Sequence, residues 1–217
     1  MVTAAGRSKR HWLLKRLLDV FIAAVAIVVL SPLVLIVAVL VAVTMGLPLM
    51  FSQRRLGLSA EEFTLHKFRT MREASDEEGR PLPDEQRMTT AGIALRRTRL
   101  DELPGFLSVL AGHMSLVGPR PLPAYIVEHL PGAEERTLVR PGFTGLAQVS
   151  GNTRLTNREK IALDLYYIRH STMLMDLQIL LKTAVTVIAG EERDEALIAA
   201  ALGEAGPDSS GGLNPAT

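Results

Sequence analysis

The sequence predicts an α+β fold that is mostly helical and is attached to a membrane by one apolar segment. Residues 20–43 are apolar throughout except for a central Ser-Pro pair, and this run is long enough to match the hydrocarbon thickness of a bilayer. Residues 53–71 have a short, mixed periodicity that indicates one or two brief strands or turns. Residues 158–169 and 174–188 carry apolar side chains at the spacing of amphipathic helices, and the second of these suits the membrane surface. The 217 residues leave room for one ordinary domain beside the apolar segment.

The composition excludes several kinds of site. The chain has no cysteine, which rules out disulfides, thiolate catalysis and cysteine-based zinc sites. The formal net charge is only +1, but basic residues gather at the start of the chain and acidic residues gather after Glu191. We therefore assign residues 1–19 as a basic N-terminal segment. Residues 191–217 are rich in Ala, Gly, Asp, Ser and Pro, which is typical of a mobile tail.

The apolar run, with its flank, is interpreted as a membrane element over residues 20–50 that is retained. It is too long for the apolar core of a cleaved signal peptide, and it lacks a clear cleavage site. Pro32 removes a backbone donor and clashes with the preceding turn, so the run can form two half-helices that meet at a bend at Ser31 and Pro32. Each half is too short to span a bilayer alone.

Two topologies are open for this element. Basic residues flank both of its ends, and the positive-inside bias favours the cytoplasm for both. This pattern favours a re-entrant hairpin that enters and leaves by one face, with Ser31 satisfying a backbone group that the proline frees. The alternative is a single transmembrane helix with a proline kink.

Two adjacent carboxylates, Asp101 and Glu102, are the first candidates for chemistry. They follow three arginines within residues 96–99, and the apolar spacing beyond them predicts that they lie at a helix N-terminus. Positive charge and a helix N-terminus keep a carboxylate ionised and favour a phosphate beside it. A carboxylate that attacks phosphorus also needs cations to offset anionic repulsion. The alternative is that the pair only caps the helix.

Two loops contain candidate phosphate ligands. Arg120 stands between two prolines, which restrict the backbone and favour a fixed guanidinium. Arg140 opens a Pro-Gly turn that resembles a tight loop near a ligand. Each could equally be an ordinary surface turn. The histidines show no helical metal-ligand spacing, so we expect no metal site built on them; those considered are His66, His113, His129 and His170.

Taken together, these blocks resemble the monotopic phosphoglycosyl transferases of the bacterial sugar transferase superfamily, in particular its small, single-domain members. The resemblance runs from about Lys15 to Ile188. Its blocks are Lys15-Arg16 with Asp19, Ser31-Pro32, the Gln53, Arg55, Gly57 series, Lys67 to Met71, Leu100 to Pro104, Met114 to Pro121, Arg140 to Gly145, Gln148, and Asp164 with Tyr167 and Asp176. So many blocks in one order make the resemblance specific.

The resemblance implies a fold and a location. The expected fold is a re-entrant membrane helix broken at Ser31-Pro32, amphipathic interfacial helices, and a small catalytic domain over residues 51–190. The expected location is the bacterial inner membrane, with a monotopic anchor and the catalytic domain facing the cytoplasm. The resemblance thereby favours the hairpin over the single span.

The resemblance also implies a reaction. Asp101 would attack the phosphate that bears the sugar of a UDP-sugar and release UMP, and undecaprenyl phosphate would then attack the phosphosugar-aspartyl intermediate. Mg²⁺ would be held at Asp101, and Glu102 would assist catalysis. The expected substrate-binding residues are Lys67, Arg69, Arg120 and Arg140. Expected partners are the two substrates and membrane lipid, with downstream glycosyltransferases or a second copy of the chain as further candidates, and no nucleic acid.

Some positions depart from the family pattern. Gly105 and Ser108 stand where relatives often have glutamine and asparagine, and Ala147 and Asn152 stand where many have tryptophan and arginine. Arg154 is a candidate replacement for that arginine. A catalytically idle membrane scaffold with the same fold is the alternative function, although the presence of the charged motif residues argues against it. No motif reads the donor sugar.

Overall fold

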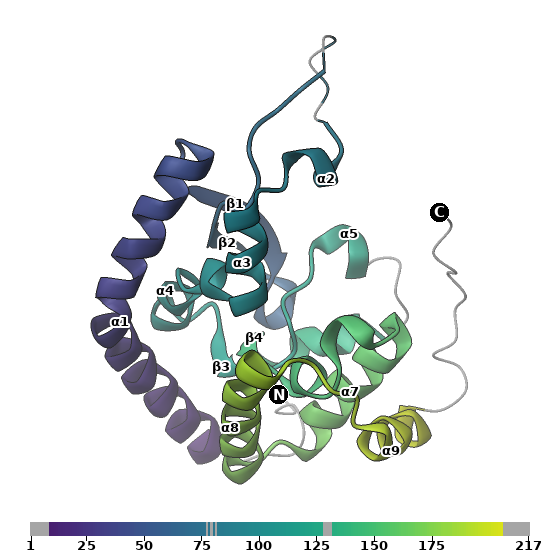
Figure 1. Ribbon diagram of the computed structural model, residues 1–217. Coiled ribbons are helices and arrows are strands. Elements are labelled where there is room, and N and C mark those ends of the chain that lie inside the picture. Colours follow the sequence, from purple (N-terminus) through teal and green to yellow (C-terminus); the bar gives the residue numbers. More distant parts are fainter. Residues whose placement is uncertain (1–8, 77, 79, 81, 128–131, 206–217) are drawn as a thin grey trace.

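The computed structural model describes residues 9–76, 78, 80, 82–127 and 132–205. A long N-terminal helix runs along one side of a small, mostly helical domain that also holds two short sheets (Figure 1). The main elements are α1 (Lys9–Met45), β1 (Met50–Leu56), β2 (Glu62–Phe68), α2 (Asp84–Arg87), α3 (Thr90–Thr98), α4 (Gly105–Ala111), β3 (Ser115–Val117), α5 (Ala124–Val127), β4 (Gly142–Thr144), α6 (Leu146–Val149), α7 (Asn157–His170), α8 (Met173–Ala189) and α9 (Glu195–Ala205). The predicted α+β, mostly helical class is confirmed.

Helix α1 is continuous through Pro32. The expected two half-helices are therefore joined in one unbroken helix. This helix bends, so that its two halves lie at an angle and curve around the domain (Figure 1). Ser31 Oγ donates a hydrogen bond to the carbonyl oxygen of Val28 at 2.8 Å, which is the backbone acceptor that a proline at position 32 leaves without its amide partner. Within the described chain, this is the one helix long and apolar enough to cross a membrane.

The predicted basic segment (residues 1–19) and membrane segment (residues 20–50) are continuous in secondary structure where they meet. From Lys9 onward the basic residues belong to the same helix as the apolar run, and residues 1–8 lie outside the described chain. Lys15 Nζ forms a buried ion pair with Asp176 of α8 at 2.6 Å. Asp19 accepts hydrogen bonds from Ser115 Oγ at 2.7 Å and from the backbone amide of Leu116 at 3.2 Å. These contacts attach the first half of α1 to the domain.

The second half of α1 packs against the same domain through apolar contacts. Val37, Val41 and Met45 are buried in a cluster with Phe68 of β2 and Leu95 of α3. Both ends of α1 therefore contact one domain, while much of its apolar surface between them stays exposed; the exposed side chains include Val25, Val28, Val29, Leu35, Ile36 and Val39.

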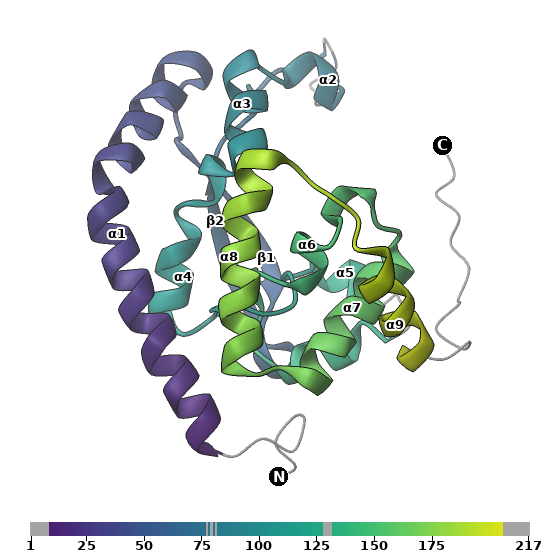
Figure 2. The same cartoon turned by 60° about the horizontal axis from the view of Figure 1, so that its bottom comes forward.

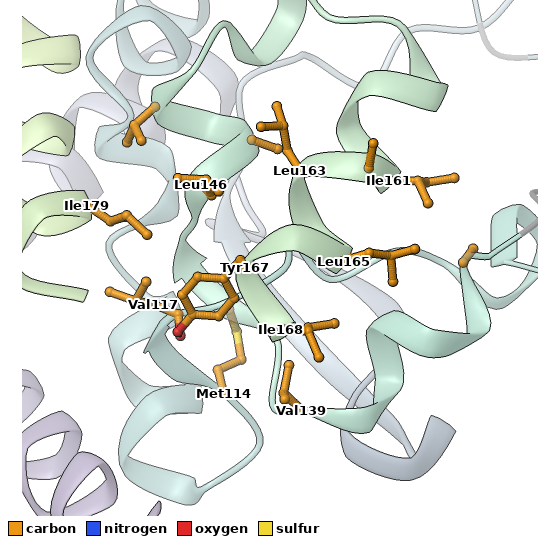
Figure 3. Close-up of a cluster of buried hydrophobic side chains, with 14 of the residues drawn as sticks. Met114, Val117, Val139, Leu146, Ile161, Leu163, Leu165, Tyr167, Ile168 and Ile179 are labelled. Atoms are coloured by element: carbon orange, nitrogen blue, oxygen red, sulfur yellow. The ribbon is translucent and has the colours of Figure 1, made fainter. Parts of the chain in front are cut away.

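The main core lies between α7, α8 and the short β3–β4 sheet. Tyr167 of α7 lies beside Val117 and Met114 (Figure 3), and its hydroxyl oxygen is 2.7 Å from Asp176 Oδ1. Helix α7 begins with a capping box in which Thr156 and Glu159 satisfy each other's backbone amides. Helix α8 exposes a row of apolar side chains, namely Leu174, Leu177, Leu181, Val185 and Ile188. The two predicted amphipathic helices are thus confirmed as helices.

The two sheets are small. Strands β1 and β2 form an antiparallel hairpin with Met50 opposite Phe68, as the mixed pattern of residues 53–71 indicated. Strands β3 and β4 are parallel, with Val117 opposite Thr144. The chain just after β3 and the first residue of β4 approach so closely that a Cβ on Gly142 would lie 2.1 Å from the backbone nitrogen of Gly118. Only glycine fits at this crossing.

The prediction of a mobile tail from residue 191 is wrong for the part that the structure describes. Helix α9 packs along α7, and its Ile198 and Ala201 are buried in the main core. Apolar residues at helical spacing within the Ala-rich segment make this contact. Composition alone does not distinguish such a segment from a disordered one. Residues 206–217 lie outside the described chain.

Candidate active site

A cavity of about 1140 Å³ opens between β2, the turn after α3, the loop after β3 and the N-terminal end of α7. The side chains that line it carry nine basic and six acidic groups, an excess of three positive charges. The basic residues are Arg55, Lys67, Arg69, Arg87, Arg96, Arg99, Arg120, Arg136 and Lys160. A cavity with this charge favours a multiply charged anion.

Asp101 and Glu102 lie in a short 3-10 turn between α3 and α4. Arg99 adopts a left-handed conformation with φ of 57°, which ends α3 and turns the chain toward the cavity. Pro104 then precedes the first residue of α4 and suits the start of a helix. The expected location at a helix N-terminus is confirmed to within one turn, and both carboxylates are 9% exposed.

Glu102 is held by two cations. Its Oε1 atom accepts hydrogen bonds from Lys67 Nζ and from a guanidinium nitrogen of Arg120, each at 2.5 Å. Burial acts to raise the pKa of Glu102, but Arg120 and Lys67 outweigh burial and lower it to about 2. The same environment lowers the pKa of Lys67, because burial and the charge of Arg120 outweigh the attraction of Glu102. Glu102 is therefore a permanent anion that fixes both cations.

Asp101 differs from its neighbour. It is the one acidic residue lining the cavity that forms no ion pair within the described part of the chain. Burial and the adjacent charge of Glu102 raise its pKa, against the attraction of Lys67 and Arg96. A carboxylate with a raised pKa is a stronger base and nucleophile once it is ionised. Its oxygens are available to a ligand or an electrophile.

The position of Arg120 depends on two contacts of the loop after β3. Gly118 and Gly142 have no side chains, so this loop can pack closely against the start of β4 and bring Arg120 into the cavity wall. Arg136 donates a hydrogen bond to the backbone carbonyl oxygen of Arg120 at 2.9 Å. Arg136 is itself paired with Asp164 of α7 at 2.6 Å, and both side chains are buried.

The structure brings together five of the six predicted charged site residues. Asp101, Glu102, Lys67, Arg69 and Arg120 all line the cavity. The guanidinium of Arg69 donates to the carbonyl oxygen of Pro48 at 2.9 Å and lies near Glu73.

Arg140 does not line this cavity. Its Nε donates to the carbonyl oxygen of Gly112 at 2.9 Å, at the C-terminal end of α4. Arg154, the candidate replacement for a family arginine, is also absent from the cavity wall. The Pro-Gly turn at this position is part of the close crossing of Gly118 and Gly142, and a role for Arg140 in substrate binding stays a prediction.

Some residues at the cavity were missed by sequence reasoning. Arg136, Lys160 and Glu191 were not singled out, and Asp164 was noted without a role. Pairing between Arg136 and Asp164 could not be found from spacing, because 28 residues separate them in sequence. In the described chain no histidine lines the cavity, and no group of three His, Cys, Asp or Glu side chains could hold a metal ion by itself. His129 lies outside the described residues.

Residues 10–190 match the family model described as bacterial sugar transferase. The chain belongs to the bacterial sugar transferase family. This bacterial sugar transferase match covers the charged site from Lys67 to Asp164, and it ends one residue before Glu191.

Similar proteins with curated names support this assignment. The chain is 39% identical over 188 residues to the exopolysaccharide production protein PSS of Rhizobium leguminosarum bv. phaseoli, covering 80% of this chain and 94% of that protein. It is 37% identical over 190 residues to the UDP-N-acetylgalactosamine-undecaprenyl-phosphate N-acetylgalactosaminephosphotransferase of Aeromonas hydrophila (82% and 44%). It is 40% identical over 187 residues to the UDP-glucose:undecaprenyl-phosphate glucose-1-phosphate transferase of Xanthomonas campestris pv. campestris (80% and 38%). The chain thus spans less than half the length of the last two relatives.

Proposed function

We propose that this chain transfers a sugar 1-phosphate from a UDP-sugar to undecaprenyl phosphate, as the first membrane step of glycoconjugate or exopolysaccharide synthesis. The observation that carries the proposal is the contrast between two neighbouring carboxylates. Asp101 has a raised pKa and no ion pair with any described residue, whereas Glu102 is fixed as an anion between Lys67 and Arg120. Two adjacent groups whose pKa values are pushed apart suit two different roles in one reaction.

In the first step, an ionised oxygen of Asp101 attacks the phosphorus atom that bears the sugar. A bond forms between that oxygen and phosphorus, the bond from phosphorus to the bridging oxygen of the diphosphate breaks, and UMP leaves with the electron pair. In the second step, a phosphate oxygen of undecaprenyl phosphate attacks the same phosphorus, and the aspartyl bond breaks. The products are undecaprenyl diphosphate sugar and the free Asp101 carboxylate, ready for another cycle.

The basic residues of the cavity would lower the repulsion between Asp101 and the diphosphate. Lys67 and Arg120 are fixed by Glu102, so they cost little reorganisation when charge moves onto the leaving phosphate. UMP is a stable anion and needs little protonation, which agrees with a cavity wall that has no histidine in the described chain. Glu102 acts here by positioning these cations.

The donor set at the site fits a magnesium ion that is shared with substrate. Mg²⁺ prefers oxygen ligands and is commonly held by one or two carboxylates together with substrate phosphates. Within the described residues Asp101 supplies one such carboxylate without an ion pair, whereas Glu102 is already paired with cations. We propose that Asp101 would hold Mg²⁺, which would supply charge neutralisation at the diphosphate when bound.

The shape of α1 supports a re-entrant anchor. Its two ends contact the same domain, through Lys15 and Asp19 on one side of the bend and through Val41 and Met45 on the other. A helix that crossed the bilayer would have its ends in different compartments, so one folded domain could not contact both. We propose that the exposed apolar surface of α1 enters one leaflet and returns, with α8 at the interface.

This geometry would keep the cavity at the cytoplasmic face of the bacterial inner membrane, where the soluble donor and the lipid acceptor meet. The relatives' names include two different donor sugars, UDP-N-acetylgalactosamine and UDP-glucose, at similar identity to this chain. The proposal therefore covers UDP-hexoses and UDP-N-acetylhexosamines as a class.

The reaction is tested with purified protein in nanodiscs, UDP-sugars, Mg²⁺ and undecaprenyl phosphate. We expect the native chain to release UMP and Asp101→Asn to release none, and a phosphosugar adduct on Asp101 to be trapped when the acceptor is omitted. Full activity of Asp101→Asn would exclude the nucleophile assignment. No release by the native chain with any donor would instead favour the idle scaffold.

The topology is tested in the cysteine-free chain with single cysteines at Arg10 and at Glu61. Both positions are exposed and lie on opposite sides of the bend in α1. We expect a membrane-impermeant thiol reagent to label both in inside-out vesicles and neither in right-side-out vesicles. Labelling from opposite sides would establish a transmembrane helix.

A further inference from the structure

The cavity wall includes one carboxylate, that of Glu191, from beyond the end of the family match. Its Oε1 atom accepts a hydrogen bond from Asn152 Nδ2 and lies 3.2 Å from a guanidinium nitrogen of Arg99. Its Oε2 atom accepts from the backbone amide of Thr153 at 3.1 Å and from the hydroxyl of the same residue. Four donors from two separate segments therefore converge on this one side chain.

The two segments that Glu191 joins both belong to the site. Arg99 is two residues before Asp101, and another of its nitrogens lies 3.9 Å from Glu102. Asn152 and Thr153 form the turn between α6 and α7, and both line the cavity. Glu191 thus connects the segment that carries the candidate nucleophile to the turn before α7, and both belong to the cavity wall.

The turn at Asn152 needs such support. Gly151 and Asn152 both have positive φ values, 139° and 43°, and a left-handed backbone at a residue other than glycine is costly unless its surroundings hold it. The turn is also held from outside the cavity, where Arg193 donates to the carbonyl oxygen of Arg154 and pairs with Glu159 at 2.8 Å.

The segment from Glu191 to Arg193 is itself anchored at both ends. Gly190 ends α8 with a φ of 97°, and α9 packs on α7 immediately afterwards. The connection between α8 and α9 crosses the domain on the side away from α1 (Figure 2). Helix α7, which begins just after the turn that Glu191 holds, lies on the side of the domain away from α1 (Figures 1 and 2).

We propose that Glu191 is a positioning residue for the nucleotide-sugar donor, because it holds Arg99 and the Asn152–Thr153 turn in place in the cavity wall. The inference rests on the proposed function and deepens it. A soluble, anionic donor reaches the cavity from solvent, whereas the lipid acceptor arrives along the side of α1. Loss of Glu191 should therefore weaken donor binding and leave acceptor binding unchanged.

The test compares Glu191→Gln and Glu191→Ala with the native chain and with Glu204→Gln. Glu204 of α9 pairs with His170 and Arg169 and does not line the cavity, so it is a matched control for loss of one charge. We expect the KM for the UDP-sugar to rise about 10-fold in Glu191→Ala, equivalent to about 1.4 kcal/mol. The kcat and the KM for undecaprenyl phosphate should stay within about twofold, and Glu191→Gln should fall between.

A second measurement separates positioning from general loss of structure. We expect Kd for UDP, measured by calorimetry on the same nanodisc samples, to rise in parallel with the donor KM, and Glu191→Asp to recover part of the affinity. An unchanged donor KM and Kd for UDP in Glu191→Ala would overturn the inference, as would equal changes in both substrates' KM values. If the native chain releases no UMP, the proposed function fails, whereas UDP binding still tests the role of Glu191.

Discussion

The side chain of Arg136 binds the main chain of Arg120 and not its side chain. One guanidinium nitrogen of Arg136 donates to the carbonyl oxygen of Arg120 at 2.9 Å, while the same group pairs with Asp164. The side chain of Arg120 is thereby left to bind Glu102 at the cavity. A buried ion pair elsewhere in the cavity wall thus supports the position of Arg120.

Breaking this pair should destabilise the protein. Asp164→Asn leaves the buried charge of Arg136 without its counterion, and we expect a loss of about 3 kcal/mol in the free energy of unfolding. The double variant Arg136→Met/Asp164→Leu should recover much of that stability, because it removes both buried charges. Its kcat/KM should stay low, since Arg120 has lost its backbone support. Denaturant titration and UMP release measure the two effects, and a fully active double variant would contradict this role.

The pH dependence of the native chain should report Asp101. The reactive form is the carboxylate, so activity should rise with pH through the pKa of Asp101, which burial and Glu102 raise above its ordinary value of 3.8. Glu102 has a pKa of about 2 and stays ionised across this range. The acidic limb of kcat/KM for UMP release therefore should have its midpoint above 3.8. A midpoint at or below that value would show that Asp101 is not perturbed as described.

Glu102→Gln should change both the rate and the pH profile. The substitution leaves Lys67 and Arg120 without their shared counterion, so we expect kcat to fall about a hundredfold, as when a preorganised group is lost from an active site. It also removes the negative charge that raises the pKa of Asp101. The acidic limb of the remaining activity should therefore move to lower pH. A limb that moves to higher pH would exclude this coupling between the two carboxylates.

Arg120 and Arg140 should respond differently to the same substitution. Arg120→Ala removes a cation from the cavity, and we expect at least a hundredfold loss of kcat/KM. Arg140→Ala removes one hydrogen bond to the end of α4, at a cost of about 1 kcal/mol of stability, with the KM for the donor unchanged. A rise in donor KM for Arg140→Ala, without loss of stability, would return Arg140 to the substrate-binding residues.

The sequence was a good guide where a local pattern decides the structure. The helical spacing of residues 174–188 and the Ser-Pro pair in the apolar run predicted α8 and the bend of α1, because each depends on neighbours in the chain. The convergence of Lys67, Asp101 and Arg120 was anticipated through resemblance to a family rather than through spacing. No local pattern distinguishes Asp101 with its raised pKa from a helix cap.

The sequence was a poor guide where distant segments meet. Arg140 looked like a ligand because a Pro-Gly turn is common near ligands, yet the turn serves the crossing of Gly118 and Gly142. Glu191 and α9 looked like part of a mobile tail because their composition is Ala-rich and polar, yet α7 provides a surface that orders α9. In both places the structure depends on contacts between residues that are far apart in sequence.

The attachment of α1 at both ends also has a consequence for protein engineering. Asp19 occupies a buried position that satisfies Ser115 and Leu116, and Lys15 balances the buried charge of Asp176. Deletion of α1 to obtain a water-soluble enzyme would leave Asp176 and Ser115 without their partners inside the domain. It would also expose the apolar side chains of Phe68 and Leu95 to solvent. A soluble version would have to keep the helix and replace only the exposed apolar residues of α1 with polar ones.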